Sequence, residues 1–203
     1  MKIVQKYSHQ NGFEYLMYHR PDLWAEIEAC IHEVDAEKCR TKQSKEARKA
    51  GRTLLAPKVL NKRFAEEFNA RGWKSQTTRN WLSEHLDDIK RIARLPPDEQ
   101  RAYLDGLGRE KLKTSNQTDF VKDRVAVEMQ LGKYAFVAHD LFVKHMSFFL
   151  NDDIDVAVEV VPMKIMEQQM SSGVPYYERD LFNLVRQGRG VPAVPIILVG
   201  IAP

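Results

Sequence analysis

The chain has 203 residues, of which 43% are hydrophobic and 29% charged, and its net charge is +3 at neutral pH. This length is typical of one domain with a substantial core, so we expect a single domain over residues 1–203. No apolar run approaches the ~20 residues needed to cross a bilayer, and the first residues lack the apolar core of a secretory signal. A cytoplasmic protein with no membrane partner is therefore predicted.

Positive charge is concentrated between Arg40 and Arg52, where RTKQSKEARKAGR holds six cations and one Glu. Such a segment can follow a phosphate backbone and release counterions as it docks. It can equally be a solvated helix face or loop, and the sequence leaves both readings open. Cys30 and Cys39 are predicted to be free thiols, because a chain of this length needs no disulfide and the compartment is predicted to be reducing.

The first half, residues 1–115, is predicted to be mainly helical. The segment PDLWAEIEACIHEV begins with a proline, which suits a first helical turn, and repeats its apolar residues at helical spacing. Two further apolar stripes follow, the second of them ended by Pro96 and Pro97. Their members are Leu60, Phe64 and Phe68 in the first stripe, and Trp81, Leu82, Leu86, Ile89 and Ile92 in the second.

The second half, residues 116–203, is predicted to hold a catalytic sheet. A short strand around Asp119, a turn near Lys122 and a strand over Arg124–Leu131 come first. A helix over about residues 136–150 is followed by IDVAVEVV, an apolar, β-branched run typical of a strand buried on both faces. The helix YYERDLFNLVRQ and the strand VPIILVGIA complete an α/β fold with a mixed central β-sheet flanked by helices.

The candidate site lies in DFVKDRVAVEMQLGK, where Asp119 precedes Glu128 by nine positions. Side chains alternate along a strand, so Glu128 and Gln130 are expected on one face and Met129 on the other. Two carboxylates and an amide then form an oxygen-rich pocket. Such a pocket suits a hard divalent cation that also contacts a substrate phosphate. Phosphodiester cleavage is the reaction this chemistry favours.

An acidic residue, a hairpin turn and E-x-Q on a strand resemble the PD-(D/E)XK nuclease core. Together with MSSGVPYYE, VPIILVGIAP and PDLWAEIE, the pattern resembles the BamHI and BglII branch of the type II restriction endonucleases. This resemblance spans almost the whole chain. It implies a restriction endonuclease-like fold, Mg²⁺ as cofactor with Mn²⁺ able to substitute, and a homodimer acting on double-stranded DNA.

The resemblance also implies roles for individual residues. Asp119 and Glu128 would be metal-binding and catalytic, and Met129 would offer its backbone carbonyl to the metal. Gln130 stands where most PD-(D/E)XK nucleases have Lys, a departure that disfavours any mechanism needing an ammonium at that position. We assign Gln130 to orienting the attacking water by hydrogen bonding.

Sequence-reading residues are expected just after the catalytic strand and in the SSG loop. Lys133 and Ser172 are the leading candidates and Ser171 is the third, because Lys can donate to guanine N7 and O6 and a hydroxyl can donate or accept. The alternative is that Lys133 contacts only phosphate while the serines shape the turn before Gly173.

The resemblance implies cleavage of R^GATCY with 5′ GATC overhangs, and a companion DNA methyltransferase in the host that acts on the same site. Two-fold symmetry of a homodimer accounts for a palindromic site. Two other functions stay open from the sequence. One is a repair or structure-specific nuclease with the same pocket, and the other is a DNA-binding module without catalysis.

Overall fold

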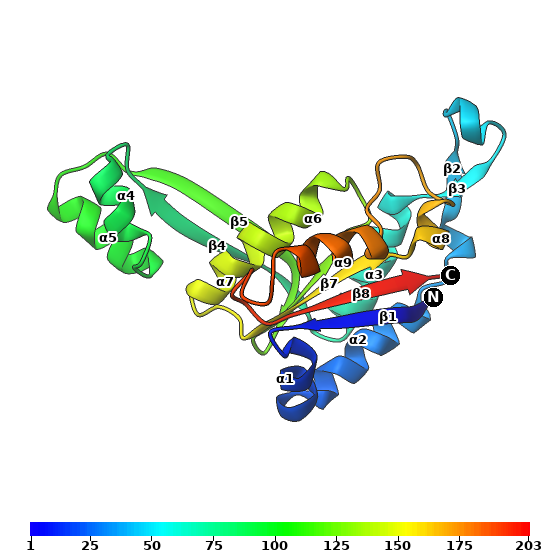
Figure 1. Ribbon diagram of the computed structural model, residues 1–203, viewed down its shortest axis with the longest axis horizontal. Helices are drawn as coiled ribbons and strands as arrows, with labels where there is room; N and C mark the ends of the chain where they lie inside the picture. The colour runs from blue at the N-terminus through cyan, green and yellow to red at the C-terminus, as the bar shows by residue number, and fades with distance from the viewer.

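A computed structural model describes all residues, 1–203, and is built around a six-stranded mixed sheet (Figure 1). The strand order is β1-β8-β7-β6-β5-β4, in which β6, β7 and β8 run parallel and every other neighbour is antiparallel. The bounds are β1 (Lys2–His9), β4 (Lys74–Leu82), β5 (Leu112–Lys122), β6 (Val125–Met129), β7 (Val156–Pro162) and β8 (Ile196–Ala202).

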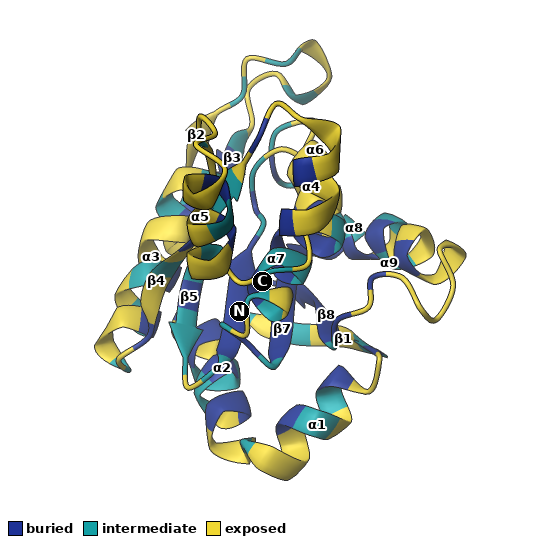
Figure 2. Ribbon diagram, turned by 90° about the vertical axis from the view of Figure 1, so that its left-hand side faces the viewer, coloured by how far each residue is buried: buried dark blue, intermediate teal, exposed yellow.

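Helices cover both faces of this sheet, and side chains of the central strands alternate between the two layers. In β6, Val125, Val127 and Met129 pack in one apolar cluster and Ala126 in the other. The first cluster lies against α1 (Gly12–His19), α2 (Pro21–Glu33) and α3 (Pro57–Ala70). The second lies against α6 (Ala135–His139), α7 (His145–Leu150) and α9 (Tyr177–Arg186). The buried strands and exposed outer helix faces are visible in Figure 2.

One helical segment on the second face is continuous from α6 to α7. A π-helical turn, Asp140–Lys144, joins the two, so residues 135–150 form one rod with a locally widened turn. Such turns shift side chains relative to a regular helix and are frequent at functional sites. This rod lies beside the strand that carries the candidate site.

Two extensions project from the sheet at opposite ends of the molecule (Figure 1). Strands β4 and β5 form a long arm that carries α4 (Leu86–Ile92) and α5 (Pro97–Gly106) at its tip. At the other end, β2 (Arg40–Gln43) and β3 (Thr53–Leu55) form a hairpin. The 3₁₀ turn Glu37–Cys39 precedes the hairpin, and the 3₁₀ turn Ala47–Lys49 lies between its two strands. Helix α8 (Lys164–Glu167) lies after β7 and leads to the SSG loop.

The sequence-based expectations for the second half are confirmed in their main features. The strands near Asp119, over 125–129, 156–162 and 196–202, the helix over 135–150 and the helix over 177–186 are all present. The turn near Lys122 is also present, with Asp123 and Arg124 both at positive φ. Cys30 and Cys39 are buried and unpaired, as expected.

Residues 1–115 hold the helices α1 to α5, but the expectation of a mainly helical half is incomplete, because this half also supplies β1, β4 and the first four residues of β5 to the sheet. The second apolar stripe, Trp81 to Ile92, does not form one helix. Trp81 and Leu82 are the last residues of β4, whereas Leu86, Ile89 and Ile92 belong to α4. The arm strands β4 and β5 are largely polar and exposed. Their pairing with each other stabilises the strand conformation more than the few apolar residues at helical spacing favour a helix. Among the helices, none is both long and apolar enough to span a membrane.

Gly12 at the start of α1 packs directly on β8, and this contact gives a test of the fold. A methyl group at Gly12 would lie 2.8 Å from the backbone nitrogen of Ile196, which cannot move without disturbing the sheet. We expect Gly12→Ala to destabilise the protein by about 1–3 kcal/mol in denaturant unfolding, because overpacking forces backbone shifts. Gly106→Ala, which meets no atom within 4 Å, should leave stability nearly unchanged. Equal stability of the two variants would contradict the packing of α1 on β8.

Candidate active site

The candidate site forms where β5 and β6 stop pairing with each other. Their backbone ladder ends at Phe120 and Val127. Beyond it, the Asp119 amide donates to Glu128 Oε2 at 3.1 Å, and the Met129 amide donates to Asp119 Oδ2 at 3.2 Å. Thr118 Oγ1 also donates to Glu128 Oε2, at 2.9 Å. Direct hydrogen bonds therefore hold together Asp119, Glu128 and Met129, the three residues that the sequence analysis names as metal ligands.

A buried lysine that sequence reasoning missed completes the site. Lys144 Nζ lies 2.7 Å from Glu128 Oε1 and 2.6 Å from Asp140 Oδ1. The side chains of Lys144 and Glu128 are only 9% and 8% exposed, so the ammonium and the carboxylate face each other out of water. The π-helical turn brings Asp140 and Lys144 to this position from the rod over residues 135–150.

Gln130 joins the same network from the end of β6. Its Nε2 donates to Asp140 Oδ2 at 2.8 Å, and its Oε1 accepts from the Gly132 amide at 3.3 Å. Glu128 and Gln130 thus both reach the same turn, as expected for side chains on one face of a strand. The amide of Gln130 has one fixed orientation, because one end donates and the other accepts.

Burial is the main cause that raises the pKa values of the two strand carboxylates. Burial, followed by the neighbouring charge of Asp119, raises the pKa of Glu128 to about 7, against the opposing attraction of Lys144. Burial also raises the pKa of Asp119, although the Met129 amide opposes the rise. Burial alone would lower the pKa of Lys144, but Glu128 and Asp140 together raise it, so Lys144 stays charged.

A second buried pair lies beside this network on the same face of the sheet. His145 Nε2 is 2.9 Å from Glu159 Oε2, both side chains are fully buried, and Glu159 is the ladder partner of Glu128. Burial lowers the pKa of His145 to about 3 and raises that of Glu159 well above its ordinary value. Both shifts favour the uncharged forms of the two side chains, as expected for groups removed from water.

Asp119 and Met129 border an open cleft of about 410 Å³. Residues of α3 form its other side, and its lining consists of Asn61, Lys62, Ala65, Asn69, Ser75, Gln117, Asp119, Phe120 and Met129. No group of three or more His, Cys, Asp or Glu side chains is arranged as a ready-made metal cluster. Glu128 is not part of this lining and is buried against Lys144. The Asp119 carboxylate at the cleft, with the Glu128 carboxylate hydrogen-bonded to the Asp119 amide behind it, forms an oxygen-rich donor set that suits Mg²⁺, which takes few protein ligands and keeps several waters.

The structure also brings together the segments that carry the expected reading residues. The Tyr134 amide donates to the Gly173 carbonyl at 2.8 Å, which joins the loop after Lys133 to the SSG loop. Lys133 and Ser172 are exposed, and Ser171 is half-buried. The Ser172 amide and hydroxyl both donate to Glu46, at 2.8 and 2.5 Å, a contact that sequence reasoning did not anticipate.

A signal for Lys144 was present in the sequence. On the predicted helix over residues 136–150, the stripe that packs on the sheet includes Val137, Leu141 and Phe148, and Asp140 and Lys144 lie within it. Charged residues on the buried face of a helix need partners there. A search of the buried helix face for charged residues, as well as for apolar ones, would have identified Asp140 and Lys144 as a buried ion pair.

Comparison with known proteins places the chain in a family. A sequence model described as restriction endonuclease BglII/BglIII matches residues 4–201. Among solved structures, BglII complexed with a DNA 16-mer matches with a TM-score of 0.69 and 23% identity, covering 100% of this chain and 79% of that chain. Free BglII matches with a TM-score of 0.59 and 20% identity, covering 100% and 80%. No curated protein sequence matches.

The chain belongs to the BglII/BglIII restriction endonuclease family. It is a type II site-specific deoxyribonuclease, a DNA-binding hydrolase. Restriction endonucleases generally use divalent metal ions, which agrees with the oxygen-rich site at Asp119 and Glu128.

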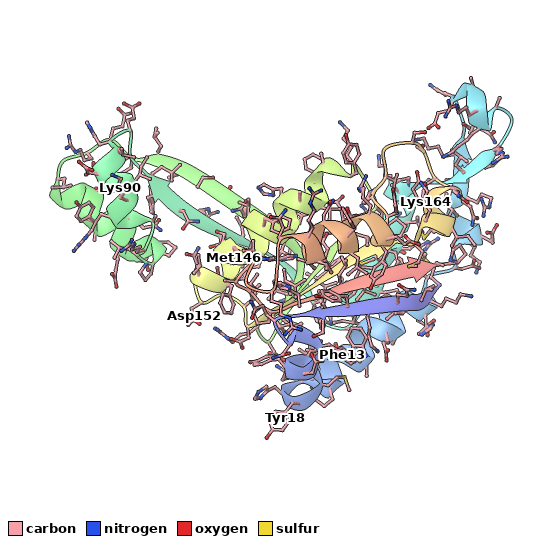
Figure 3. All side chains as sticks on the ribbon, in the orientation of Figure 1. Phe13, Tyr18, Lys90, Met146, Asp152 and Lys164 are labelled. Carbon is pink, nitrogen blue, oxygen red and sulfur yellow. The ribbon has the colours of Figure 1, made fainter.

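Replacing Lys144 tests the network directly. In Lys144→Met, Glu128 and Asp140 lose their shared cation while remaining buried, so we expect a loss of about 3–5 kcal/mol in unfolding free energy at pH 8. The control is Lys90→Met at the tip of the arm (Figure 3). Its partner Asp87 is exposed. That variant should unfold like the wild type, because exposed pairs contribute little. A Lys144 variant as stable as the control would show that the network is not formed.

The raised pKa of Glu128 gives a pH-dependent test in metal-free buffer. A carboxyl whose pKa rises from 4.5 to about 7 on folding contributes stability that is lost as the pH increases through that range. Relative to Glu128→Gln, the wild type should therefore lose about 1–3 kcal/mol between pH 4.5 and pH 8 in denaturant unfolding. Parallel pH profiles for the two proteins would mean that Glu128 keeps an ordinary pKa.

Proposed function

We propose that this enzyme cleaves a palindromic GATC-centred DNA site, R^GATCY, and leaves 5′ GATC overhangs. The proposal rests on the hydrogen-bonded carboxylates of Asp119 and Glu128 at the point where β5 and β6 stop pairing. That arrangement supports assignment to the PD-(D/E)XK nucleases. The proposed DNA recognition site rests on sequence resemblance. Within the BamHI and BglII branch, the chain resembles BstYI.

Asp119, Glu128 and the Met129 carbonyl are the proposed ligands of Mg²⁺, for which Mn²⁺ can substitute. A divalent cation held there would supply positive charge to the transferring phosphoryl group and lower the pKa of water. Because Lys144 already holds Glu128 and Asp140, the burial of these carboxylates does not depend on the cation. Gln130, fixed by Asp140 and Gly132, is proposed to orient the attacking water.

A homodimer is proposed because a palindromic site is matched by two-fold symmetry. The outer surfaces of α9 and of the rod over residues 135–150 support it, since large apolar side chains there contact solvent. They are Phe136 and Val143 on the rod, Tyr134 just before it, and Phe182 and Val185 on α9. Surfaces of this kind on neighbouring elements are characteristic of protein interfaces. Each subunit would then cut one strand, and a companion methyltransferase would protect the same site in host DNA.

DNA contact is proposed along the edge that holds Lys133, the SSG loop and the β2–β3 hairpin. The hairpin cations Lys42, Lys45, Arg48 and Arg52 form no ion pair within the protein. Unpaired surface cations are the groups that neutralise phosphate and release counterions. Lys133 and Ser172, with Ser171 beside them, are proposed to contact base edges in the major groove.

Asp119→Asn is the test of the catalytic assignment. Removing one carboxylate charge beside the scissile phosphate should reduce cleavage by about 100-fold or more, while DNA binding in metal-free buffer is largely kept. Asp87→Asn, in an exposed position on the arm, should cleave like the wild type. Full cleavage activity in the Asp119 variant would show that Asp119 is not catalytic. If the far-ultraviolet circular dichroism spectrum of this variant differs from that of the wild type, its fold is perturbed, and the milder Asp119→Glu is tested in its place.

Sequencing the DNA ends from digestion of one mapped plasmid tests the function itself. Discrete fragments with 5′ GATC ends, each cut preceded by a purine, are expected in Mg²⁺. Cleavage that depends on branches or nicks would instead favour a repair or structure-specific nuclease. Ends with another overhang or another central sequence would overturn the proposed site while leaving the family unchanged.

A further inference from the structure

The cleft beside Asp119 is the side from which DNA can reach the candidate active site. Asp119 is half-buried and borders the cleft, whereas Glu128 and Lys144 lie behind it with side chains only 8% and 9% exposed. A phosphate that contacts the Asp119 carboxylate must therefore lie in the cleft. The wall across the cleft, which α3 supplies, then faces the same DNA strand.

This wall is formed by one face of α3. The α3 residues that line the cleft are separated by three or four positions, the spacing at which side chains share a face of a helix. Ala65 lies in the middle of this face, and its small side chain leaves room above it. Exposed polar side chains surround it, three from α3 and one each from β4 and β5: Asn61, Lys62, Asn69, Ser75 and Gln117.

The polar lining consists of side chains that can donate to phosphate. Amide, hydroxyl and ammonium groups all donate hydrogen bonds, and phosphate oxygens accept them. The lining holds two charged side chains, Asp119 and Lys62. Without a divalent cation, Asp119 repels the phosphate of a bound strand, and Lys62 is the cation in the lining that offsets this repulsion.

Lys62 is available to bind a phosphate. Its ammonium lies 3.9 Å from Glu66 Oε1, which is too long for a hydrogen bond, and its side chain is 77% exposed. An exposed pair of this kind contributes little, so its loss on DNA binding costs little. Arg63 pairs with the same Glu66 at 2.8 Å, but it lines a separate pocket next to Glu67 and does not line the cleft.

We propose that Lys62 binds a DNA phosphate next to the scissile one and so holds the strand in the cleft beside Asp119. The inference rests on the proposed function, in which Asp119 lies at the scissile phosphate. It assigns to α3 a contact with the strand that is cut, separate from the contacts proposed for Lys133, the SSG loop and the β2–β3 hairpin.

The experiment compares the wild type with Lys62→Ala and Arg63→Ala. Affinity for a duplex that carries the cleaved site is measured in metal-free buffer over a range of salt concentrations. Each variant removes one exposed cation from α3 and one pair with Glu66, so the two differ mainly in where the charge is lost. Alanine favours the helix, so both variants should fold like the wild type.

Lys62→Ala should weaken binding by about tenfold, the size of one hydrogen bond to a charged group. The slope of log affinity against log salt concentration should decrease by about 0.9 for each phosphate contact that is lost. Arg63→Ala should keep both quantities close to the wild-type values. Equal losses in the two variants, or no loss in either, would overturn the inference.

A scan of the DNA then locates the phosphate. Single phosphates of the duplex are replaced in turn by uncharged methylphosphonate. At the phosphate that Lys62 binds, this replacement should weaken binding by the wild type and by Arg63→Ala but not by Lys62→Ala, because that contact is already absent. The phosphate should adjoin the cut. Coupling at a phosphate far from the cut, or at none, would contradict the placement of Lys62 in the cleft with the cleaved strand.

The cut is mapped with the wild type in Mg²⁺ on the same duplex. A cut at another sequence would mean that the proposed recognition site is wrong, and Lys62 would still be tested by the scan around the observed cut. Failure of the proposed function and failure of the inference are therefore distinguishable.

Discussion

The burial of Glu128 is the constraint on which the site depends. A carboxylate shielded from water must be protonated, paired or hydrogen-bonded, and Glu128 meets this requirement through Thr118, the Asp119 amide and Lys144. Lys144 can reach it only from the rod over residues 135–150, so the packing of that rod on the sheet is also the assembly of the site. Asp140 of the same π-helical turn accepts a hydrogen bond from Gln130, so Glu128 and Gln130 are both linked to one helical segment.

The candidate active site and the proposed base-reading segments lie at one edge of the molecule because of the parallel pairing of β6 and β7. The carboxyl ends of parallel strands lie at the same edge of a sheet. Lys133 follows the end of β6, and the SSG loop follows β7 and α8, so the two segments meet through the Tyr134–Gly173 hydrogen bond. The β2–β3 hairpin then reaches the same edge and binds Ser172. The cleft beside Asp119 and the reading loops thus share the framework of two neighbouring strands.

The sequence alone predicted the elements whose burial is local and strongly patterned. Strands β7 and β8 are continuous apolar runs, and β6 follows a tight turn at Asp123, so their existence and order could be inferred. Strands β4 and β5 could not, because an exposed two-stranded arm needs no apolar alternation. At the site, the spacing of Asp119 and Glu128 was informative. Lys144 and Glu46 act through contacts with residues far away or on another element, and spacing along the chain does not reveal such contacts.

The central claim is that Asp119, Glu128 and the Met129 carbonyl gather around one cation next to the scissile phosphate. The most direct measurement is the anomalous scattering of Mn²⁺ in crystals of the protein bound to a duplex that carries the site. The account predicts a peak within about 2.0–2.6 Å of both carboxylates and the carbonyl, the range of oxygen–cation distances. A peak elsewhere in the cleft, with the carboxylates turned away from the phosphate, would contradict it.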